Sequence, residues 1–131
     1  LKTLEKLHND VVHIMMQNAV EDELSLPLVP ENSRFAKLRE ILPPEFQWIQ
    51  DTQELYDEGK RQHNCVFEYR QGIRADTLAI YHWNCDDRQY TIEFTKRGNN
   101  FEMSQMYRSY NRPADPKDVA IVKSYIQNVT S

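Results

Sequence analysis

Three consecutive segments of this chain alternate apolar and polar residues with a period of two. They are TLAIYHW at 77–83, QYTIEFT at 89–95 and FEMSQMY at 101–107. This alternation is typical of β-strands that bury one face, and the links NCDDR and RGNN between the segments are short and rich in turn residues. Strands joined by short links pair with their neighbours, so the pattern predicts a three-stranded antiparallel meander.

The alternation also assigns side chains to the two faces of the predicted sheet. In the middle segment Tyr90, Ile92 and Phe94 share one face, and Glu93 lies on the opposite face. In the third segment Gln105 shares an aromatic-rich face with Phe101, Met103 and Tyr107. A buried amide on such a face needs hydrogen-bond partners, so Gln105 either bonds to a loop or contacts a ligand.

Helical spacing precedes these segments. Residues 3–18 repeat apolar side chains at helical intervals, and the prolines of LPLVP end that pattern. Ser33 is a candidate cap for a short second helix. The buried stripe of that helix would be Phe35, Leu38, Ile41 and Leu42.

Two more helices are predicted between this region and the sheet. Asp51 and Glu54 have the spacing of a capping box, and Gly59 fits the position just past the end of that third helix. Asn64 is a candidate cap for a fourth helix over residues 65–71, which Gly72 would close. The first turn of that helix would therefore contain a cysteine.

The chain end predicts one last helix. Asp115 followed by Pro116 is a favourable helix start, because proline suits the first helical position. Its apolar stripe would be Val119, Val122, Ile126 and Val129. The order of elements predicts an α+β fold with N-terminal helices, a three-stranded antiparallel meander and a C-terminal helix packed on the sheet.

The length of 131 residues fits one domain, 1–131, with a helical lead-in at 1–50 and a core motif region at 51–131. The first residue is leucine, so the sequence is compatible with a piece of a longer chain. No apolar run reaches the length of a membrane helix, and no signal peptide is visible. Together with only two cysteines, this favours a reduced, cytoplasmic location and no disulfide framework.

Spacing excludes the common metal and cofactor motifs. The chain has four histidines and two cysteines without zinc-site spacing, and three unclustered glycines that form no phosphate-binding loop. We therefore expect no metal and no cofactor. The sequence leaves the oligomeric state undetermined.

Charge is unevenly distributed along the chain. Residues 1–59 carry 5 basic and 12 acidic side chains, a balance of −7, whereas residues 60–112 carry 9 basic and 6 acidic ones, a balance of +3. Such asymmetry either marks a binding face for nucleic acid or a protein partner, or lets the two halves of the chain attract each other. Aromatic residues accompany the basic ones in this segment, among them Tyr81, Trp83, Tyr90, Phe101, Tyr107 and Tyr110.

Several short motifs in this order resemble the PcfJ-like proteins of plasmids, phages and other mobile elements. The motifs are EG at 58–59, HNCV at 63–66, Tyr69 four residues after the cysteine, TIE at 91–93, and Gln105 with Asn111. The chain departs from the family at Phe67 and Glu68, and again at Arg108, where glycine or small residues are frequent. The resemblance implies a mobile-element context and supplies no reaction.

The cysteine in HNCV is the first candidate for chemistry. At a helix start, Cys65 would lie in a partial positive charge that favours the thiolate, with His63 or His82 as a base. This layout is similar to that of papain-like cysteine enzymes. The alternative is that Cys65 and Tyr69 lie on one helix face that packs into the core.

Glu93 is either a general base or ligand clamp, or an exposed residue on a solvated face.

Two functions follow from these candidates. The first is an accessory domain of a mobile element that binds nucleic acid or a protein partner through residues 60–112. Its candidate ligand-binding residues are Tyr69, Arg70, Gln105, Arg108 and Asn111. The second is a thiol-dependent hydrolase or transferase with the catalytic candidates Cys65, His63, His82 and Glu93.

Overall fold

Four strands form one antiparallel sheet in the order of the chain, β1–β2–β3–β4. Their bounds are Phe46–Trp48 for β1, Ala79–Cys85 for β2, Arg88–Arg97 for β3 and Asn100–Arg108 for β4. This computed structural model describes residue 24 and residues 26–127, so the predicted helix at 3–18 lies outside the described residues. The antiparallel meander is confirmed for β2, β3 and β4.

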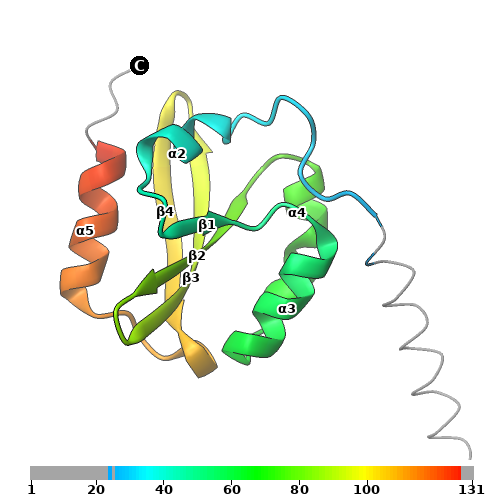
Figure 1. Cartoon of the computed structure of the whole chain (residues 1–131). Coiled ribbons are helices and arrows are strands. Elements are labelled where there is room, and N and C mark those ends of the chain that lie inside the picture. Colours follow the sequence, from blue (N-terminus) through cyan, green and yellow to red (C-terminus); the bar gives the residue numbers. More distant parts are fainter. Residues whose placement is uncertain (1–23, 25, 128–131) are drawn as a thin grey trace, which may run out of the picture.

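Helices lie on both faces of this sheet, which confirms the α+β class (Figure 1). On one side are α2 (Ala36–Ile41) and α5 (Pro116–Gln127). On the other are α3 (Thr52–Gln62), the 3₁₀ turn η1 (Val66–Tyr69) and α4 (Arg70–Arg74). A second 3₁₀ turn, η2, covers Ser109–Asn111 directly after β4. The sheet is therefore the middle of three layers.

The two faces of the sheet are packed unequally. The face towards α2 and α5 carries the larger apolar cluster, with Phe35, Leu38, Tyr81, Trp83, Tyr90, Ile92, Phe94, Phe101, Met106, Val122 and Ile126. The face towards α3 carries a smaller one, with Leu28, Ile49, Leu55, Val66, Ile73 and Ile80. Each fully buried large side chain contributes roughly 1.5–3 kcal/mol. The first face therefore supplies most of the stability and leaves room for polar groups on the second.

The prediction of three strands was wrong by one, because β1 adds a short edge strand. Phe46, Gln47 and Trp48 pair with Trp83, His82 and Tyr81 of β2. Three residues after two prolines show no measurable period, so the sequence pattern contained no strand signal there. Phe46 stacks on Trp83 with 4.5 Å between ring centroids, which ties this edge to the larger cluster.

The predicted face of Gln105 was also wrong in part, because β4 contains a bulge. Gln105 pairs with Glu93, but the next pair is Phe94 with Met103, so Ser104 has no partner. A bulge adds one residue and shifts the phase of alternation. Gln105 and Tyr107 consequently face α3, whereas Phe101, Met103 and Met106 belong to the cluster on the opposite face.

The predicted cap of α3 is confirmed, but those of the second and fourth helices are wrong. The N-cap of α2 is Phe35 rather than Ser33, and that of η1 is Cys65 rather than Asn64. Asp51 caps α3 and its Oδ1 accepts from the Glu54 N–H at 2.8 Å, which confirms the capping box. The helix continues past Gly59 to Gln62, and His63 ends it in the left-handed conformation with φ 52°. A Cβ on Gly59 would lie 3.3 Å from the Asn64 carbonyl oxygen, so glycine here serves close packing.

The predicted fourth helix is a 3₁₀ turn that continues into α4, and Gly72 lies inside α4 rather than after it. A Cβ on Gly72 would lie 2.7 Å from Leu78 Cδ2, so this glycine also permits a close approach. The C-terminal helix begins at Pro116 as predicted, with Val122 and Ile126 buried. Val129 lies outside the described residues.

Candidate functional site

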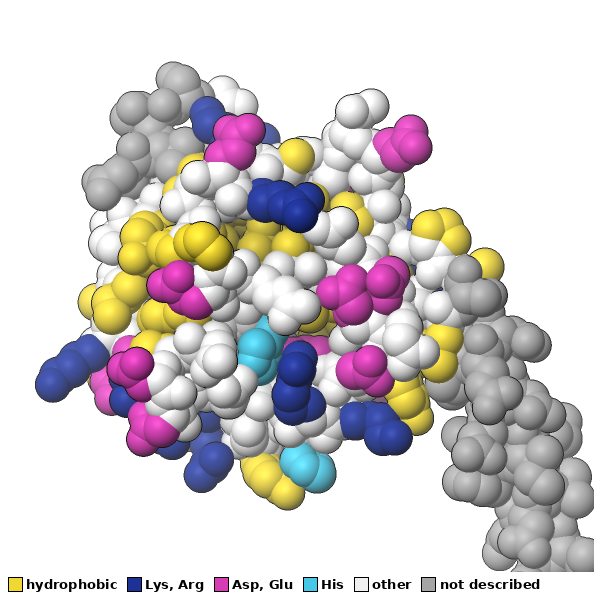
Figure 2. All heavy atoms as spheres, in the orientation of Figure 1, with side chains coloured by type: hydrophobic (Ala, Val, Ile, Leu, Met, Phe, Trp, Pro, Cys, Tyr) yellow, Lys and Arg dark blue, Asp and Glu magenta, His cyan; other side chains and the backbone are white. Residues whose placement is uncertain are grey.

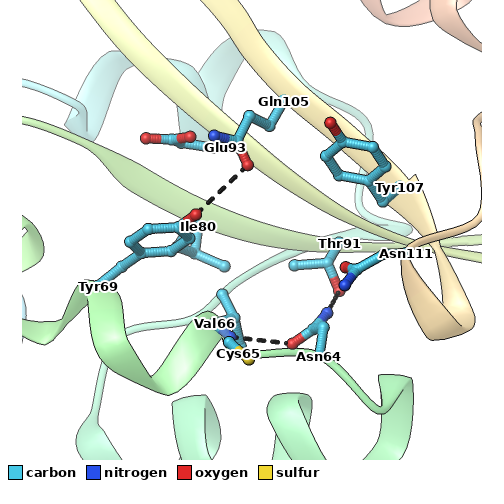
Figure 3. Close-up of a pocket in the computed structure, with 10 residues that line it drawn as sticks. All are labelled: Asn64, Cys65, Val66, Tyr69, Ile80, Thr91, Glu93, Gln105, Tyr107 and Asn111. Atoms are coloured by element: carbon cyan, nitrogen blue, oxygen red, sulfur yellow. Dashed lines mark hydrogen bonds between the residues drawn. The ribbon is translucent and has the colours of Figure 1, made fainter.

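A hollow of about 410 Å³ opens between the sheet and the η1 segment, and we call it the polar pocket (Figure 3). Three separate parts of the chain line it: the turn after α3 together with η1, the face of the sheet that looks towards α3, and η2. The lining residues are Asn64, Cys65, Val66, Tyr69, Ile80, Thr91, Glu93, Gln105, Tyr107 and Asn111. The structure thus brings together five sequence candidates: Cys65, Tyr69, Glu93, Gln105 and Asn111.

Asn64 fixes the wall of the polar pocket that carries Cys65. Its Oδ1 accepts from the Val66 N–H at 3.1 Å, and its Nδ2 donates to Thr91 Oγ1 at 3.2 Å. The first bond closes a local turn that starts η1, and the second binds that turn to β3. Cys65 is exposed and immediately precedes η1.

The opposite wall is a cross-strand pair. Glu93 of β3 and Gln105 of β4 are direct partners, so their side chains stand next to each other on one face. The Tyr69 hydroxyl lies 3.5 Å from Gln105 Oε1 and donates to it. Figure 3 shows the Glu93 carboxylate, the Gln105 amide and the Tyr69 hydroxyl at the same end of the polar pocket.

Glu93 is the charged group of the polar pocket. Burial raises the pKa of its carboxyl above the ordinary value, because a half-buried carboxylate is incompletely hydrated. Ser104 Oγ donates to the Glu93 backbone carbonyl at 3.3 Å, but no hydrogen bond from the described residues ends on the side-chain carboxylate. The carboxylate is therefore an available acceptor.

His82 lies beneath the polar pocket and does not line it. Its Nδ1 is 2.8 Å from Glu58 Oε2 and its Nε2 is 2.5 Å from Gln89 Oε1. Thr91 Oγ1 also donates to Glu58 Oε2, at 2.6 Å. Both ring nitrogens thus have partners in a buried network, and the expected role of His82 as a base for Cys65 finds no support in this position.

Glu58 is fully buried, which the sequence pattern did not predict. Burial raises the pKa of Glu58, but hydrogen bonds from His82, Thr91 and Arg61 outweigh burial and leave it below its ordinary value. Arg61 Nη2 donates to Glu58 Oε1 at 2.5 Å. A signal was present in the spacing, because Glu58 follows Leu55 by three residues and so shares the buried face of α3.

The remaining candidates lie around the polar pocket rather than in it. His63 is exposed and stacks on Tyr110, with 4.3 Å between ring centroids. The Arg70 guanidinium lies 4.1 Å from the centroid of the Phe67 ring. The Arg108 N–H donates to the Arg112 carbonyl at 2.9 Å, so these two arginines flank η2.

The sheet does not expose the aromatic residues that were expected to form a binding surface together with the basic ones. Tyr81, Trp83, Tyr90 and Phe101 are buried in the larger cluster and offer no face for stacking. Three tyrosines are exposed instead, Tyr69, Tyr107 and Tyr110, and all belong to the surroundings of the polar pocket. Tyr69 and Tyr107 line it, and Tyr110 is adjacent in sequence to Asn111, which lines it as well.

A second hollow of about 570 Å³ lies beside β1 and contains none of the sequence candidates. Its lining includes Arg39, the two prolines Pro43 and Pro44, and the stacked pair Trp48 and Tyr81. Within the described part of the chain, no three metal-ligating side chains are grouped as in a metal site. None of its helices is long and apolar enough to span a bilayer.

Comparisons of this chain with protein-family models, with curated proteins and with solved structures found no match. The resemblance to the PcfJ-like proteins stays a prediction. Function therefore has to follow from the chemistry of the polar pocket.

Proposed function

We propose that this domain binds single-stranded nucleic acid and holds one unstacked base in the polar pocket. The observation that carries the proposal is the grouping of exposed tyrosines around a polar hollow. Among the described residues the large hydrophobic side chains that are exposed are Leu26, Tyr69, Tyr107, Tyr110 and Ile121. Two of these five, Tyr69 and Tyr107, line the polar pocket, and their rings would stack on bases there. Tyr110 directly precedes Asn111, which also lines it.

The size and lining of the polar pocket suit a single base. Its volume of about 410 Å³ falls in the range of small-ligand sites. Ile80 and Val66 supply an apolar floor, while Glu93, Gln105 and Asn111 supply polar groups that can fix the orientation of a ring. Bases in a duplex are stacked and paired, so only a single strand or an end offers one to such a hollow.

Charge supports strand binding only modestly. Arg108 and Arg112 flank η2 next to the polar pocket and would contact phosphates. Arg61 and Arg88 are already engaged by the buried carboxylates of Glu58 and Asp118. Figure 2 shows basic and acidic side chains interspersed on one face of the molecule, without a continuous basic band. We therefore expect base contacts to supply much of the affinity.

The test is fluorescence anisotropy with a labelled strand of about 12 nucleotides and with the matching duplex. We expect the single strand to bind more tightly, and its affinity to fall as salt rises from about 50 to 200 mM. Tyr107→Ala should weaken binding roughly 10-fold, since a stacked base contributes about 1–3 kcal/mol.

Ile121→Ala is the matched control, because Ile121 and Tyr107 are both 40% exposed and Ile121 lies on α5, away from the polar pocket. It should leave the affinity unchanged. A strand that fails to bind at low salt, or that binds Tyr107→Ala as well as the unmodified protein, would contradict the proposal. The resemblance to PcfJ-like proteins would place this binding on a mobile element.

Thiol chemistry is a second candidate function. The specific observation is that an exposed Cys65 thiol and the Glu93 carboxylate line the same polar pocket, where the raised pKa of Glu93 suits a general base. Neither His63 nor His82 is among the lining residues. In this candidate Glu93, on the wall opposite Cys65, would act as a base on a bound substrate or water and not on the thiol. A Cys65→Ser variant without any loss of reaction would exclude it.

A further inference from the structure

We infer that Glu93 and Gln105 together select guanine as the base held in the polar pocket. This inference rests on the proposed function and adds the identity of the ligand. It starts from the pairing of β3 with β4, in which Glu93 and Gln105 are direct partners. Side chains of such partners stand about 5 Å apart at Cβ, so a carboxylate and an amide present one continuous edge.

The hydrogen bonds already present determine what that edge offers. Gln105 Oε1 accepts from the Tyr69 hydroxyl. This leaves the Nε2 amide NH₂ group of Gln105 to donate into the polar pocket. The Glu93 carboxylate carries two acceptor oxygens, and none of its hydrogen-bonding capacity is used by the described residues. The edge therefore presents two hydrogen-bond acceptors from Glu93 beside one hydrogen-bond donor from Gln105.

Guanine is the base with the complementary edge. Its N1–H and N2–H₂ groups are adjacent donors that can bond to the two carboxylate oxygens of Glu93. Its O6 can accept from the Gln105 amide NH₂ group. Uracil and thymine place one donor between two acceptors, so they match only two of the three groups and set an acceptor oxygen against the second carboxylate oxygen. Adenine and cytosine each turn a ring nitrogen with a lone pair towards the carboxylate, which is repulsive.

The bulge at Ser104 sets the register that places Gln105 on this edge in the present sequence. Without the register shift between Glu93 and Phe94, Gln105 would alternate onto the other face of the sheet with Met103 and Phe101. Tyr107 follows on the same face as Gln105 and lines the polar pocket, where its ring would stack on the bound base. Gln105 and Tyr107 thus supply one part of the edge and the stacking ring from alternate positions of β4, while Glu93 completes the edge from β3.

The experiment compares thymine-rich single strands that carry one central guanine, hypoxanthine, adenine or cytosine. Hypoxanthine lacks the N2 amino group and so tests the second donor. We expect guanine to bind roughly 10-fold or more tightly than adenine or cytosine, with hypoxanthine between them. Glu93→Gln should abolish this preference. Glu102→Gln is the control, because it removes the same charge from an exposed position of β4 outside the polar pocket.

The outcomes separate the two proposals. Equal affinity for all four strands, still reduced by Tyr107→Ala, overturns the selection of guanine and leaves strand binding in place. No binding of any strand overturns the proposed function. Free GMP is a further arm: if GMP binds with dependence on Glu93 while no strand binds, selection of guanine stands and the natural ligand is a nucleotide.

Discussion

At the scale of single residues, Asn64 holds the η1 segment against the sheet with both ends of its amide. The Oδ1 accepts from Val66 and the Nδ2 donates to Thr91. Asn64→Ala removes both bonds and leaves a partly buried N–H without a partner, so we expect a loss of about 1–3 kcal/mol in the free energy of unfolding. Denaturant unfolding measures it. Asn99→Ala, in an exposed turn, should change stability by less than about 0.5 kcal/mol.

The two cysteines should differ in reactivity. Cys65 is exposed at the polar pocket, whereas Cys85 Sγ lies 3.6 Å from both Asp118 and Arg88. Burial, with the neighbouring Asp118 carboxylate, raises the pKa of the Cys85 thiol, which lowers its thiolate fraction at neutral pH. Iodoacetamide at pH 7 should therefore label Cys65 first, as mass spectrometry of timed samples would show. Faster labelling of Cys85 would contradict this ordering.

At the scale of elements, the bulge in β4 allows a matched pair of deletions. Ser104 is the residue without a partner, so deleting it should restore regular alternation and keep Gln105 opposite Glu93. Deleting Gln105 instead lets Ser104 take that position, with the same chain length and the same core residues. We expect both variants to fold with similar circular dichroism spectra, and only the deletion of Gln105 to lose preference for guanine.

A different result would locate the error. If both deletions unfold the chain, the bend of the bulged strand is needed for packing. If both variants fold and both lose the preference for guanine, the bulge itself positions Gln105.

The elements also show where the sequence pattern was sufficient. Caps and long periods predicted the start of α3 at Asp51, the start of α5 at Pro116 and the three longer strands, because each depends on local chemistry. The edge strand β1 and the bulge were missed, since three residues show no period and a single extra serine leaves no pattern.

The sequence predicted several of the residues that line the polar pocket, but not the contacts that surround it. Alternation and cap positions selected Cys65, Glu93 and Gln105, which line it. Sequence could not reveal that His82 is engaged by Glu58, because that contact joins residues 24 positions apart on different elements. Pairing across a fold depends on tertiary packing, which local propensity does not encode.

At the scale of the whole molecule, each outer layer is tied to the sheet by one buried carboxylate. On one face Glu58 of α3 accepts from Thr91 and contacts His82. On the other face Asp118 of α5 accepts from Arg88 at 2.6 Å and from the Tyr90 hydroxyl at 2.5 Å. Both carboxylates are buried. Protonation of either one weakens its hydrogen bonds and so weakens the attachment of that layer to the sheet.

This arrangement predicts how stability depends on pH. Hydrogen bonds from Arg88 hold the pKa of Asp118 below its ordinary value of 3.8, and the network around Glu58 holds that pKa below 4.5. A carboxyl with a lowered folded-state pKa stabilises the fold above its unfolded-state pKa, and this contribution is lost as pH falls through the folded-state value. The raised pKa values of Glu54 and Glu93 act in the opposite direction. Single variants are therefore needed to isolate each contribution.

We expect the free energy of unfolding to fall as the pH drops below the ordinary pKa values of 4.5 for Glu58 and 3.8 for Asp118, because both carboxyls have lowered pKa values in the folded state. Glu58→Gln and Asp118→Asn should be less stable than the unmodified protein at pH 7 and should lose less on acidification. Because the two sites lie on opposite faces of the sheet, the effects in the double variant should add. Denaturant unfolding at several pH values measures this. Parallel pH profiles for all four proteins would show that these carboxylates do not control acid stability.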